Sequence, residues 1–369
     1  MLNTQSRPVW VDIKPHNLVH NAQVIRALCP NAQLMAVIKA DGYGHGILEV
    51  AGALESADSF GVNSIDDVKR LHAAGIHKPC NLFAPHITLE TLSFCAEHQC
   101  RPTIYDHSHF NLLDTWGASE PSKALEVWLK VDTGMGRLGF APEEVSAVLQ
   151  RLKNCMGVKG IHLMSHLASA DDINNDLNIR QLEQFAQFDD LADIQSRSFL
   201  NSAGVVGFPK SAYDCIRPGL MLYGVSPSAH IDTKTLGLKP AMNFNSRVIS
   251  IKTIKSGHGV GYSSRFVAPE DMRIAVVAVG YGDGYPRHAP TGTPVWLNGE
   301  TVSLLGRVSM DMLVVDLRSL DAADIQTSVG DVVQLWGDKN PVEGVAAQCG
   351  TIAYELTCGI LPRVERCIS

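Results

Sequence analysis

The chain has 369 residues, 45% of them hydrophobic and 19% charged, with a formal net charge of −7. At about 150 residues per domain, this length predicts two domains or one large barrel with an extension. The acidic balance and the lack of a Lys/Arg-rich run argue against nucleic-acid binding. No apolar run reaches the roughly 18 residues of a membrane span, and the N-terminal residues MLNTQSRPVWVDI do not have the pattern of a signal peptide. We therefore expect a cytoplasmic enzyme without nucleic-acid or membrane partners.

The cysteines and histidines give no clear metal signature. The nine cysteines are scattered from Cys29 to Cys367, and without a secretory signal we interpret them as reduced thiols. One region is rich in both residue types, with His72, His77, His86, His98, His107, His109, Cys80, Cys95 and Cys100. A structural zinc site usually draws four ligands from two regularly spaced pairs, and no such pairing occurs here. We expect no metal site.

The N-terminal part of the chain alternates apolar, β-branched runs with amphipathic stretches. The predicted strands are Gln33–Lys39, Ser59–Asn63, Cys80–Phe83, Arg101–Tyr105, Leu125–Asp132, Gly157–Leu163, Ser198–Ser202 and Tyr213–Arg217. Most intervals have a helical pattern, such as Pro142–Leu152, where apolar residues recur at three- and four-residue spacings. This α/β order predicts a (β/α)8 TIM-type barrel over residues 1–235. A doubly wound sheet is the alternative, because periodicity does not decide whether a sheet closes.

The pattern changes at about residue 236, where short alternating runs are separated by Gly and Pro. The predicted strands are Arg247–Ile254, Arg273–Val279, Val295–Leu297, Met312–Leu317 and Val332–Leu335, with one helical stretch near Val342–Cys349. We therefore expect a mostly β C-terminal domain over residues 236–369. A further predicted strand, Val9–Ile13, precedes the first barrel helix and could pair with either domain.

Residues 134–139 (GMGRLG) match the G-x-G-x-x-G pattern of dinucleotide-binding loops. The match follows the fifth predicted strand, whereas the dinucleotide loop follows the first strand of its fold. The acidic residue expected about 20 positions later is also missing. We therefore reject a nicotinamide cofactor, and expect the glycines to form a tight turn that presents Arg137.

Several polar residues follow predicted barrel strands, where barrel active sites lie. Lys39 ends a buried strand, and partial desolvation there would lower the pKa of its amine and make it a usable nucleophile or base. On position alone, a lysine that extends its charged end into solvent is equally compatible.

The other polar residues follow later strands: Arg137, His166, Ser202 and Arg217. A hydroxyl at Ser202 beside the backbone N–H groups of Gly219 and Leu220 would suit a phosphate after the last two strands. As alternatives, His166 could be a core residue and Arg217 a surface ion-pair partner.

From about residue 9 to the end the chain resembles the alanine racemase family, and nine motifs in order carry this resemblance. They are residues 36–46 (AVIKADGYGHG), 130–139 (KVDTGMGRLG), 165–168 (SHLA), 201–203 (NSA), 217–224 (RPGLMLYG), 260–263 (VGYS), 279–284 (VGYGDG), 306–311 (GRVSMD) and 353–355 (AYE). The first motif is shared loosely with other fold-type III pyridoxal enzymes. The C-terminal motifs are what point to the racemase.

The resemblance implies pyridoxal 5′-phosphate as cofactor, covalently attached to Lys39. It assigns the phosphate to Tyr43, Ser202, Gly219, Leu220 and Tyr354, and places Arg217 at the ring nitrogen, with Arg137 and His166 also at the cofactor. Many pyridoxal enzymes have a carboxylate at the ring nitrogen, which keeps it protonated. An arginine is always charged and only donates hydrogen bonds. It should therefore leave the nitrogen unprotonated and restrain side reactions.

The resemblance also implies a two-base racemisation. Lys39 would serve one face of the substrate Cα, and Tyr262 from the partner subunit of a homodimer would serve the other, with His166 and Arg217 coupled to that tyrosine. An unperturbed tyrosine, with a pKa of about 10, is a poor base at neutral pH. From the residues alone, Tyr262 would instead be a buried strand residue.

Three further matches concern the substrate and a modification. Arg137 would contact the cofactor ring oxygen and the substrate carboxylate, and the backbone N–H of Met310 would also bind that carboxylate. Lys130 matches a lysine that many relatives carbamylate, which turns a cation into an anion able to hold Arg137. No metal is implied.

The sequence therefore predicts an isomerase that interconverts L-alanine and D-alanine and supplies D-alanine for bacterial peptidoglycan. A broad-spectrum amino-acid racemase is one alternative. A fold-type III decarboxylase is another, although it would need a carboxylate where Arg217 stands. A non-catalytic pyridoxal-phosphate-binding protein of the same barrel type is the third, but those relatives generally lack a second domain.

Overall fold

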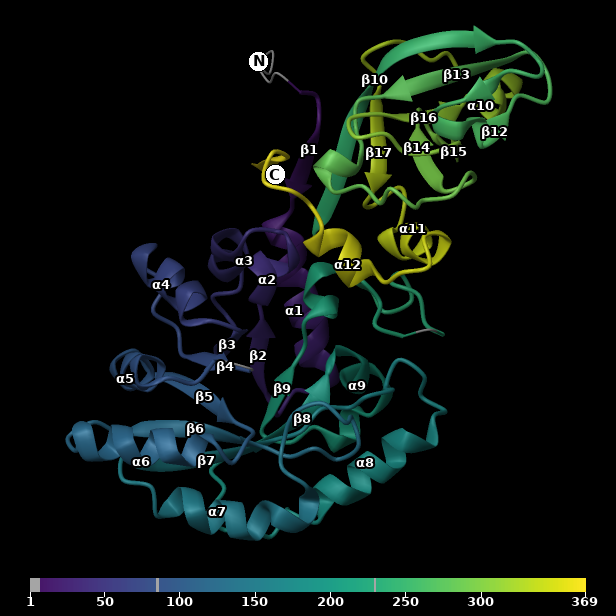
Figure 1. Ribbon diagram of the computed structural model, residues 1–369. Coiled ribbons are helices and arrows are strands. Elements are labelled where there is room, and N and C mark those ends of the chain that lie inside the picture. Colours follow the sequence, from purple (N-terminus) through teal and green to yellow (C-terminus); the bar gives the residue numbers. More distant parts are fainter. Residues whose placement is uncertain (1–6, 84–85, 229) are drawn as a thin grey trace. The chain divides into compact units, whose positions relative to one another are not determined.

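The computed structural model describes residues 7–83, 86–228 and 230–369 and divides the chain into two compact units (Figure 1). The barrel unit comprises the described parts of Leu18–Gly42 and Ile47–Leu238. The sheet unit comprises the described parts of Met1–Asn17, Tyr43–Gly46 and Lys239–Ser369. The short segment Tyr43–Gly46 thus belongs to the sheet unit although it closely follows a barrel strand in the chain.

Eight parallel strands close into a barrel in the barrel unit. The ring is closed between the first and last strands, where Gln33 pairs with Cys215. This closure confirms the predicted barrel, and the doubly wound alternative is wrong. The strands are β2 (Gln33–Val37), β3 (Ser59–Val62), β4 (Cys80–Leu82), β5 (Cys100–Ile104), β6 (Leu125–Lys130), β7 (Val158–Met164), β8 (Arg197–Asn201) and β9 (Cys215–Arg217).

Helices connect successive barrel strands and turn their apolar faces inward. In α7 (Val145–Lys153) the four residues Val145, Val148, Leu149 and Leu152 are buried, as their spacing predicts. The helical segment predicted from Pro142 begins instead with a 3-10 turn over Pro142–Glu144. The remaining helices of this part of the chain are α1 (Pro15–Leu28), α3 (Ile47–Ala53), α4 (Ile65–Ala73), α5 (Leu89–Glu97), α6 (His109–Ser119), α8 (Asp176–Ala186) and α9 (Ser202–Gly207).

The sheet unit is built on eight strands in the order β13-β16-β15-β14-β17-β10-β1-β18. An additional pairing of β13 with β10 joins the first strand of that order to a strand near its other end. The mostly β C-terminal part is therefore confirmed. The strands are β1 (Trp10–Ile13), β10 (Met242–Ile254), β13 (Met272–Val277), β14 (Pro294–Leu297), β15 (Glu300–Leu305), β16 (Leu313–Asp316), β17 (Val332–Trp336) and β18 (Glu365–Ile368).

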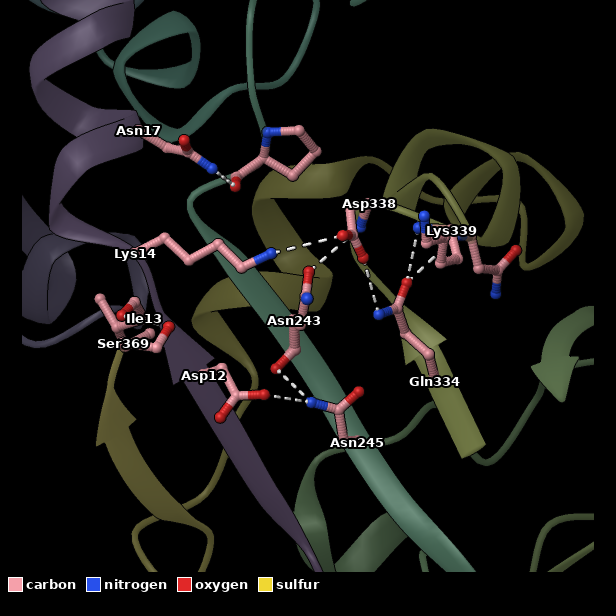
Figure 2. A network of polar contacts seen from close by, with 12 residues as sticks. Asp12, Ile13, Lys14, Asn17, Asn243, Asn245, Gln334, Asp338, Lys339 and Ser369 are labelled. Atoms are coloured by element: carbon pink, nitrogen blue, oxygen red, sulfur yellow. Dashed lines mark hydrogen bonds and ion pairs between the residues drawn. The ribbon is translucent and has the colours of Figure 1, made fainter. Parts of the chain in front are cut away.

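Strand β1 belongs to the sheet unit, pairing antiparallel with β10 and parallel with β18. Figure 2 shows the polar network beside it. The Asn245 amide donates to the Asp12 carboxylate at 2.7 Å, and the side-chain oxygen of Asn243 accepts from the Asp338 N–H at 3.1 Å. The Gln334 amide also donates to Asp338, at 2.9 Å. Burial raises the pKa of Asp12. The Asn245–Asp12 hydrogen bond thus adds to the backbone ladder that holds β1 in this sheet.

The sequence patterns missed several elements. Strand β15 begins with the polar residues Glu300 and Thr301, and β18 is a short edge strand, so neither has a strong apolar alternation. The short helices α10 (Arg318–Ala322) and α12 (Ala353–Cys358) have too few turns for a periodic signal, whereas the predicted α11 (Val342–Gln348) is present. None of the helices in the described residues is long and apolar enough to cross a membrane.

Candidate active site

Lys39 follows β2 after a single residue, at the start of an unusual turn. The segment α2 (Lys39–Tyr43) has helix-like hydrogen bonding, but the backbone inside it is left-handed. The φ/ψ values are 53/51° at Ala40, 53/47° at Asp41 and 63/42° at Gly42. A left-handed conformation costs about 1–2 kcal/mol for each residue other than glycine. The chain therefore adopts a strained turn at the point where it presents Lys39.

Two sets of hydrogen bonds hold this turn. The Gly42 N–H donates to the Ile38 carbonyl at 2.9 Å. The Asp41 carboxylate accepts from the Ile47 N–H at 3.2 Å and from the Arg70 guanidinium at 2.9 Å. Asp41 thus ties the turn to the start of α3 and to α4. Sequence reasoning missed its role, and the signal that could have found it is the tolerance of Asp for left-handed backbone.

Lys39 belongs to a cluster of positive groups at the carboxyl ends of the barrel strands. Lys130 ends β6, Arg217 ends β9, and Arg137 and His166 follow β6 and β7. Lys130 is buried, and its burial together with the charges of Arg217, Arg137 and Lys39 lowers the pKa of this lysine to about 7. Burial and the same cations lower the pKa of His166 well below its usual value. The structure thus brings these five predicted residues together at a place suited to an anionic ligand.

Arg217 is buried, so the surface ion-pair alternative is wrong. Its guanidinium donates to the Ser198 hydroxyl at 2.5 Å, to the Phe199 carbonyl at 3.4 Å and to the Ser165 carbonyl. Burial lowers the pKa of Arg217 to about 10, which still leaves it charged at neutral pH. Among the described residues no carboxylate accepts a hydrogen bond from it, so its charge is available to a ligand.

His166 is oriented by Asn201. The Asn201 amide nitrogen lies 3.3 Å from His166 Nε2, while the Asn201 side-chain oxygen caps α9 by accepting from the Gly204 N–H at 2.9 Å. If the amide donates, Nε2 is the acceptor, an arrangement that suits the neutral ring and agrees with the lowered pKa of His166. No hydrogen bond joins His166 to Arg217 within the described residues.

The predicted phosphate residues after β8 and β9 come together. Ser202 is buried at the start of α9, and its hydroxyl oxygen accepts from the Gly219 N–H at 2.9 Å and the Met221 N–H at 3.4 Å. The Gly219 N–H is therefore already bonded. Leu220 is also buried, and its N–H has no acceptor among the described residues. The Ser202 hydroxyl hydrogen and the Leu220 N–H are thus the donors best placed for an anionic oxygen.

In the glycine-rich loop after β6, the backbone N–H groups donate to the carboxylate of Asp132, a residue of the same loop. Asp132 accepts from the N–H groups of Gly134, Met135, Gly136 and Arg137 at distances from 2.8 to 3.1 Å. These are the groups that a dinucleotide loop would offer to a pyrophosphate. Asp132 instead fixes the exposed turn that carries Arg137.

Tyr43 and Tyr354 contact each other within the sheet unit, with ring centroids 5.7 Å apart. Tyr43 is buried, and its burial beside Tyr354 and Cys358 raises its pKa far above the usual range. The backbone approaches closely here, since a Cβ on Gly44 would overlap the Thr357 carbonyl oxygen. Only glycine allows this approach of the Tyr43 segment to α12.

Tyr262 and Met310 also lie in the sheet unit. Tyr262 begins a 3-10 turn (Tyr262–Ser264) between β11 (Gly259–Val260) and β12 (Phe266–Val267), and it is 66% exposed. The alternative of a buried strand residue is therefore wrong. Ser263 and Ser264 have positive φ, so a strained turn presents the tyrosine. Met310 is 53% exposed, and its N–H has no acceptor within the described part of the chain.

Comparisons with known proteins match both units. A model for the N-terminal domain of alanine racemase matches residues 13–227, and one for its C-terminal domain matches residues 241–368. Alanine racemase from Shewanella oneidensis is 45% identical, and the match covers 97% of this chain and 98% of that protein. Alanine racemase from Nitrosococcus oceani is 44% identical, and the match covers 95% of this chain and 96% of that protein. The chain belongs to the alanine racemase family.

Solved structures agree with this assignment. The biosynthetic alanine racemase from Pseudomonas aeruginosa superimposes with a TM-score of 0.93 at 38% identity, covering 98% of this chain and 99% of that one. The alanine racemase from Acinetobacter baumannii superimposes with a TM-score of 0.90 at 34% identity, covering 98% of this chain and 100% of that one. The predicted family membership and the two-part fold are confirmed.

The region rich in histidine and cysteine does not form a metal centre in the residues that are described. No group of three or more His, Cys, Asp or Glu side chains there has an arrangement that could hold a metal ion. The rings of His72, His77 and His98 pack together instead, with centroids 4.8 and 5.0 Å from that of His72.

Proposed function

We propose that this member of the alanine racemase family interconverts L-alanine and D-alanine with pyridoxal 5′-phosphate as cofactor. The observation that carries the proposal is the position of Lys39 just beyond the end of β2, among the basic residues Lys130, Arg137 and Arg217. Because one identical reaction is named for every relative reported above, alanine is favoured over a broader range of substrates.

The barrel residues fit this cofactor. Its phosphate would be held by the Ser202 hydroxyl and by the N–H of buried Leu220, which has no acceptor in the described parts of the chain, and Lys39 would hold its aldehyde carbon through Nζ. We further assign Gly219, Tyr43 and Tyr354 to the phosphate and Arg217 to the ring nitrogen, with Arg137 and His166 beside the ring. When bound, pyridoxal phosphate withdraws electrons from the Cα of an amino acid and makes its proton acidic.

Two residues would then move the proton. The Lys39 amine would take it from, or return it to, one face of Cα, and the Tyr262 phenol of the partner subunit would act on the other face. Its 66% exposure supports this proposal, since a side chain that reaches into another chain's site must project from its own. His166 would be coupled to that tyrosine and to Arg217, and its burial among cations favours the neutral ring. Arg137 and the Met310 N–H would orient the substrate carboxylate.

Lys130 is proposed to be carbamylated. A neutral amine adds to carbon dioxide to give a carbamate anion and releases one proton. Lys130 meets this condition because its lowered pKa leaves much of it neutral near pH 7. The resulting anion would offset the charges of Arg137 and Arg217 and hold Arg137 in place.

The decisive experiment measures the loss of the Cα proton of alanine together with its racemisation. In D₂O, either enantiomer of alanine should lose its Cα proton while it racemises, and borohydride reduction followed by peptide mapping should place the cofactor on Lys39. Absence of exchange and racemisation would overturn the activity, and label on another lysine would overturn the attachment site. Carbon dioxide release from basic amino acids would support the decarboxylase alternative instead. We further propose that the product serves peptidoglycan synthesis.

A further inference from the structure

A cluster of three thiols lies at the amino ends of two barrel strands. Cys80 begins β4 and Cys100 begins β5, and the two are direct partners in the parallel ladder. Paired residues of neighbouring strands point to the same face, about 4.8 Å apart. A disulfide needs Cα atoms about 4.4–6.8 Å apart, so this spacing allows one.

Cys95 completes the cluster from α5, the helix that connects these two strands (Figure 1). Its side chain is buried, as are those of Cys80 and Cys100. The Cys80 thiol donates to the Lys78 carbonyl at 3.3 Å and the Cys100 thiol to the His98 carbonyl at 3.5 Å, and both Cys80 and Cys95 lie near enough to the Cys100 sulfur to interact with it. We call Cys80, Cys95 and Cys100 the thiol cluster. In this cluster the sulfur atoms of three buried cysteines lie close to one another.

The three thiols differ in reactivity. The proximity of the Cys80 and Cys95 thiols lowers the pKa of Cys100 well below that of an ordinary thiol, because a neighbouring S–H stabilises its thiolate. The same contacts and burial raise the pKa values of Cys80 and Cys95, so both keep their protons. A thiolate beside a protonated thiol is the arrangement that reversible thiol oxidation uses.

We propose that the thiol cluster is a peroxide-responsive modification site in which Cys100 is oxidised and then forms a disulfide with Cys95 or Cys80. The Cys100 thiolate would attack one oxygen of hydrogen peroxide, forming the S–O bond and breaking the O–O bond, which gives a sulfenic acid and releases hydroxide. The neighbouring thiol would attack that sulfur, forming the S–S bond and releasing water. The two sulfurs are oxidised and the peroxide is reduced.

The position of the cluster separates this chemistry from catalysis. Lys39, Lys130 and Arg217 lie at the carboxyl ends of their strands, whereas Cys80 and Cys100 lie at the amino ends. Cys100 is only 2% exposed but directly follows the exposed residue Gln99, so the oxidant must be small and the chain must open locally for it to reach the sulfur. Oxidation should therefore cross-link α5 or β4 to β5 without removing a residue of the proposed active site.

Peptide mapping of the full-length holoenzyme tests the proposal. The protein is treated with hydrogen peroxide, remaining thiols are alkylated, and the unreduced chain is cut after glutamate. Cleavage after Glu55, Glu90, Glu97 and Glu120 places the three cysteines in separate fragments, 56–90, 91–97 and 98–120. We expect a disulfide joining fragment 98–120 to one of the other two, and its loss on reduction with dithiothreitol.

Variants provide the controls. Cys100→Ser should abolish the cross-link, whereas Cys155→Ser, at another buried cysteine of the barrel unit, should leave it unchanged. The proposal fails if native enzyme forms no such disulfide, if the cross-link persists in Cys100→Ser, or if fragment 98–120 pairs with a cysteine outside the cluster. The pairing in the unmodified chain decides the question even if Cys100→Ser does not fold.

Discussion

At the residue scale, Asp41 supports the turn that begins at the lysine two positions before it. Its carboxylate accepts hydrogen bonds from the Ile47 N–H and from Arg70 inside a left-handed turn. The ion pair to Arg70 is half-exposed and should contribute little, since exposed pairs are worth about 0–1 kcal/mol. The bond to the Ile47 N–H and the tolerance of Asp for this conformation should contribute more.

Asp41→Ala should lower the free energy of unfolding by about 1–3 kcal/mol, because it removes both accepted hydrogen bonds and places alanine in a left-handed conformation. Asp41→Asn should lose less, since its amide oxygen can still accept from Ile47 and asparagine tolerates this backbone. Urea unfolding of the two variants measures the difference. An Asp41→Ala variant as stable as the unmodified protein would show that Asp41 does not hold the turn.

Carbamate formation on Lys130 should depend on pH. Its neutral fraction rises as pH passes through about 7, so a carbamate should form increasingly from about pH 6 to about pH 8 in the presence of carbon dioxide. Nuclear magnetic resonance with ¹³C-bicarbonate should show a carbamate signal that Lys130→Met removes. A signal that persists in that variant would assign it to another amine.

The lowered pKa of Lys130 should also make the free energy of unfolding depend on pH when no carbon dioxide is present. The unfolded chain binds the Lys130 proton more tightly than the folded chain, because the lysine pKa is about 10.4 when exposed and about 7 here. The contribution of Lys130 to stability should therefore rise with pH between those two values.

At the scale of elements, the approach of the Tyr43 segment to α12 depends on one glycine. Gly44 has φ of +81°, and a Cβ there would overlap the backbone carbonyl of Thr357. Gly52, in α3, has no heavy atom within 4 Å of the position that a Cβ would occupy, and it lacks a positive φ. The two glycines therefore form a matched pair for substitution.

Gly44→Ala should lower the free energy of unfolding by more than about 2 kcal/mol, because backbone at both sides of the contact must move. Gly52→Ala should be neutral or raise it by up to about 1 kcal/mol through helix propensity. Thermal and urea unfolding compare the two. A Gly44→Ala variant as stable as Gly52→Ala would contradict the close approach.

At the scale of the whole molecule, the proposed shared site predicts complementation between chains. Lys39→Ala and Tyr262→Phe should each be nearly inactive. When the two variants are mixed and allowed to exchange subunits, half of the dimers combine them, and one of the two sites in such a dimer has both residues intact. Activity should therefore recover to about a quarter of the unmodified value.

A mixture that stays inactive after subunit exchange would place Lys39 and Tyr262 of one active site in the same chain. Exchange itself is verified by mass spectrometry of differently tagged variants. This separates failure of the shared site from failure of the subunits to mix.

The strands and most helices were predictable because burial imposes a period of two or 3.6 residues on the sequence. All eight barrel strands fall within a few residues of their predicted positions, and Lys39 and Arg217 were identified by their places at strand ends. The motifs of both parts indicated the family, which the comparisons confirm. Short elements such as β15, β18 and α12 were missed because so few residues do not show a clear period of two or 3.6.

Only the tertiary structure decided the features that depend on residues distant in sequence. It closed the sheet by pairing β2 with β9, and it placed β1 between β10 and β18. It also revealed the left-handed turn held by Asp41, the neutral state favoured for His166, and the meeting of three cysteines. Periodicity reports which face of an element is buried, whereas closure, charge environment and thiol contacts depend on which other elements pack against that face.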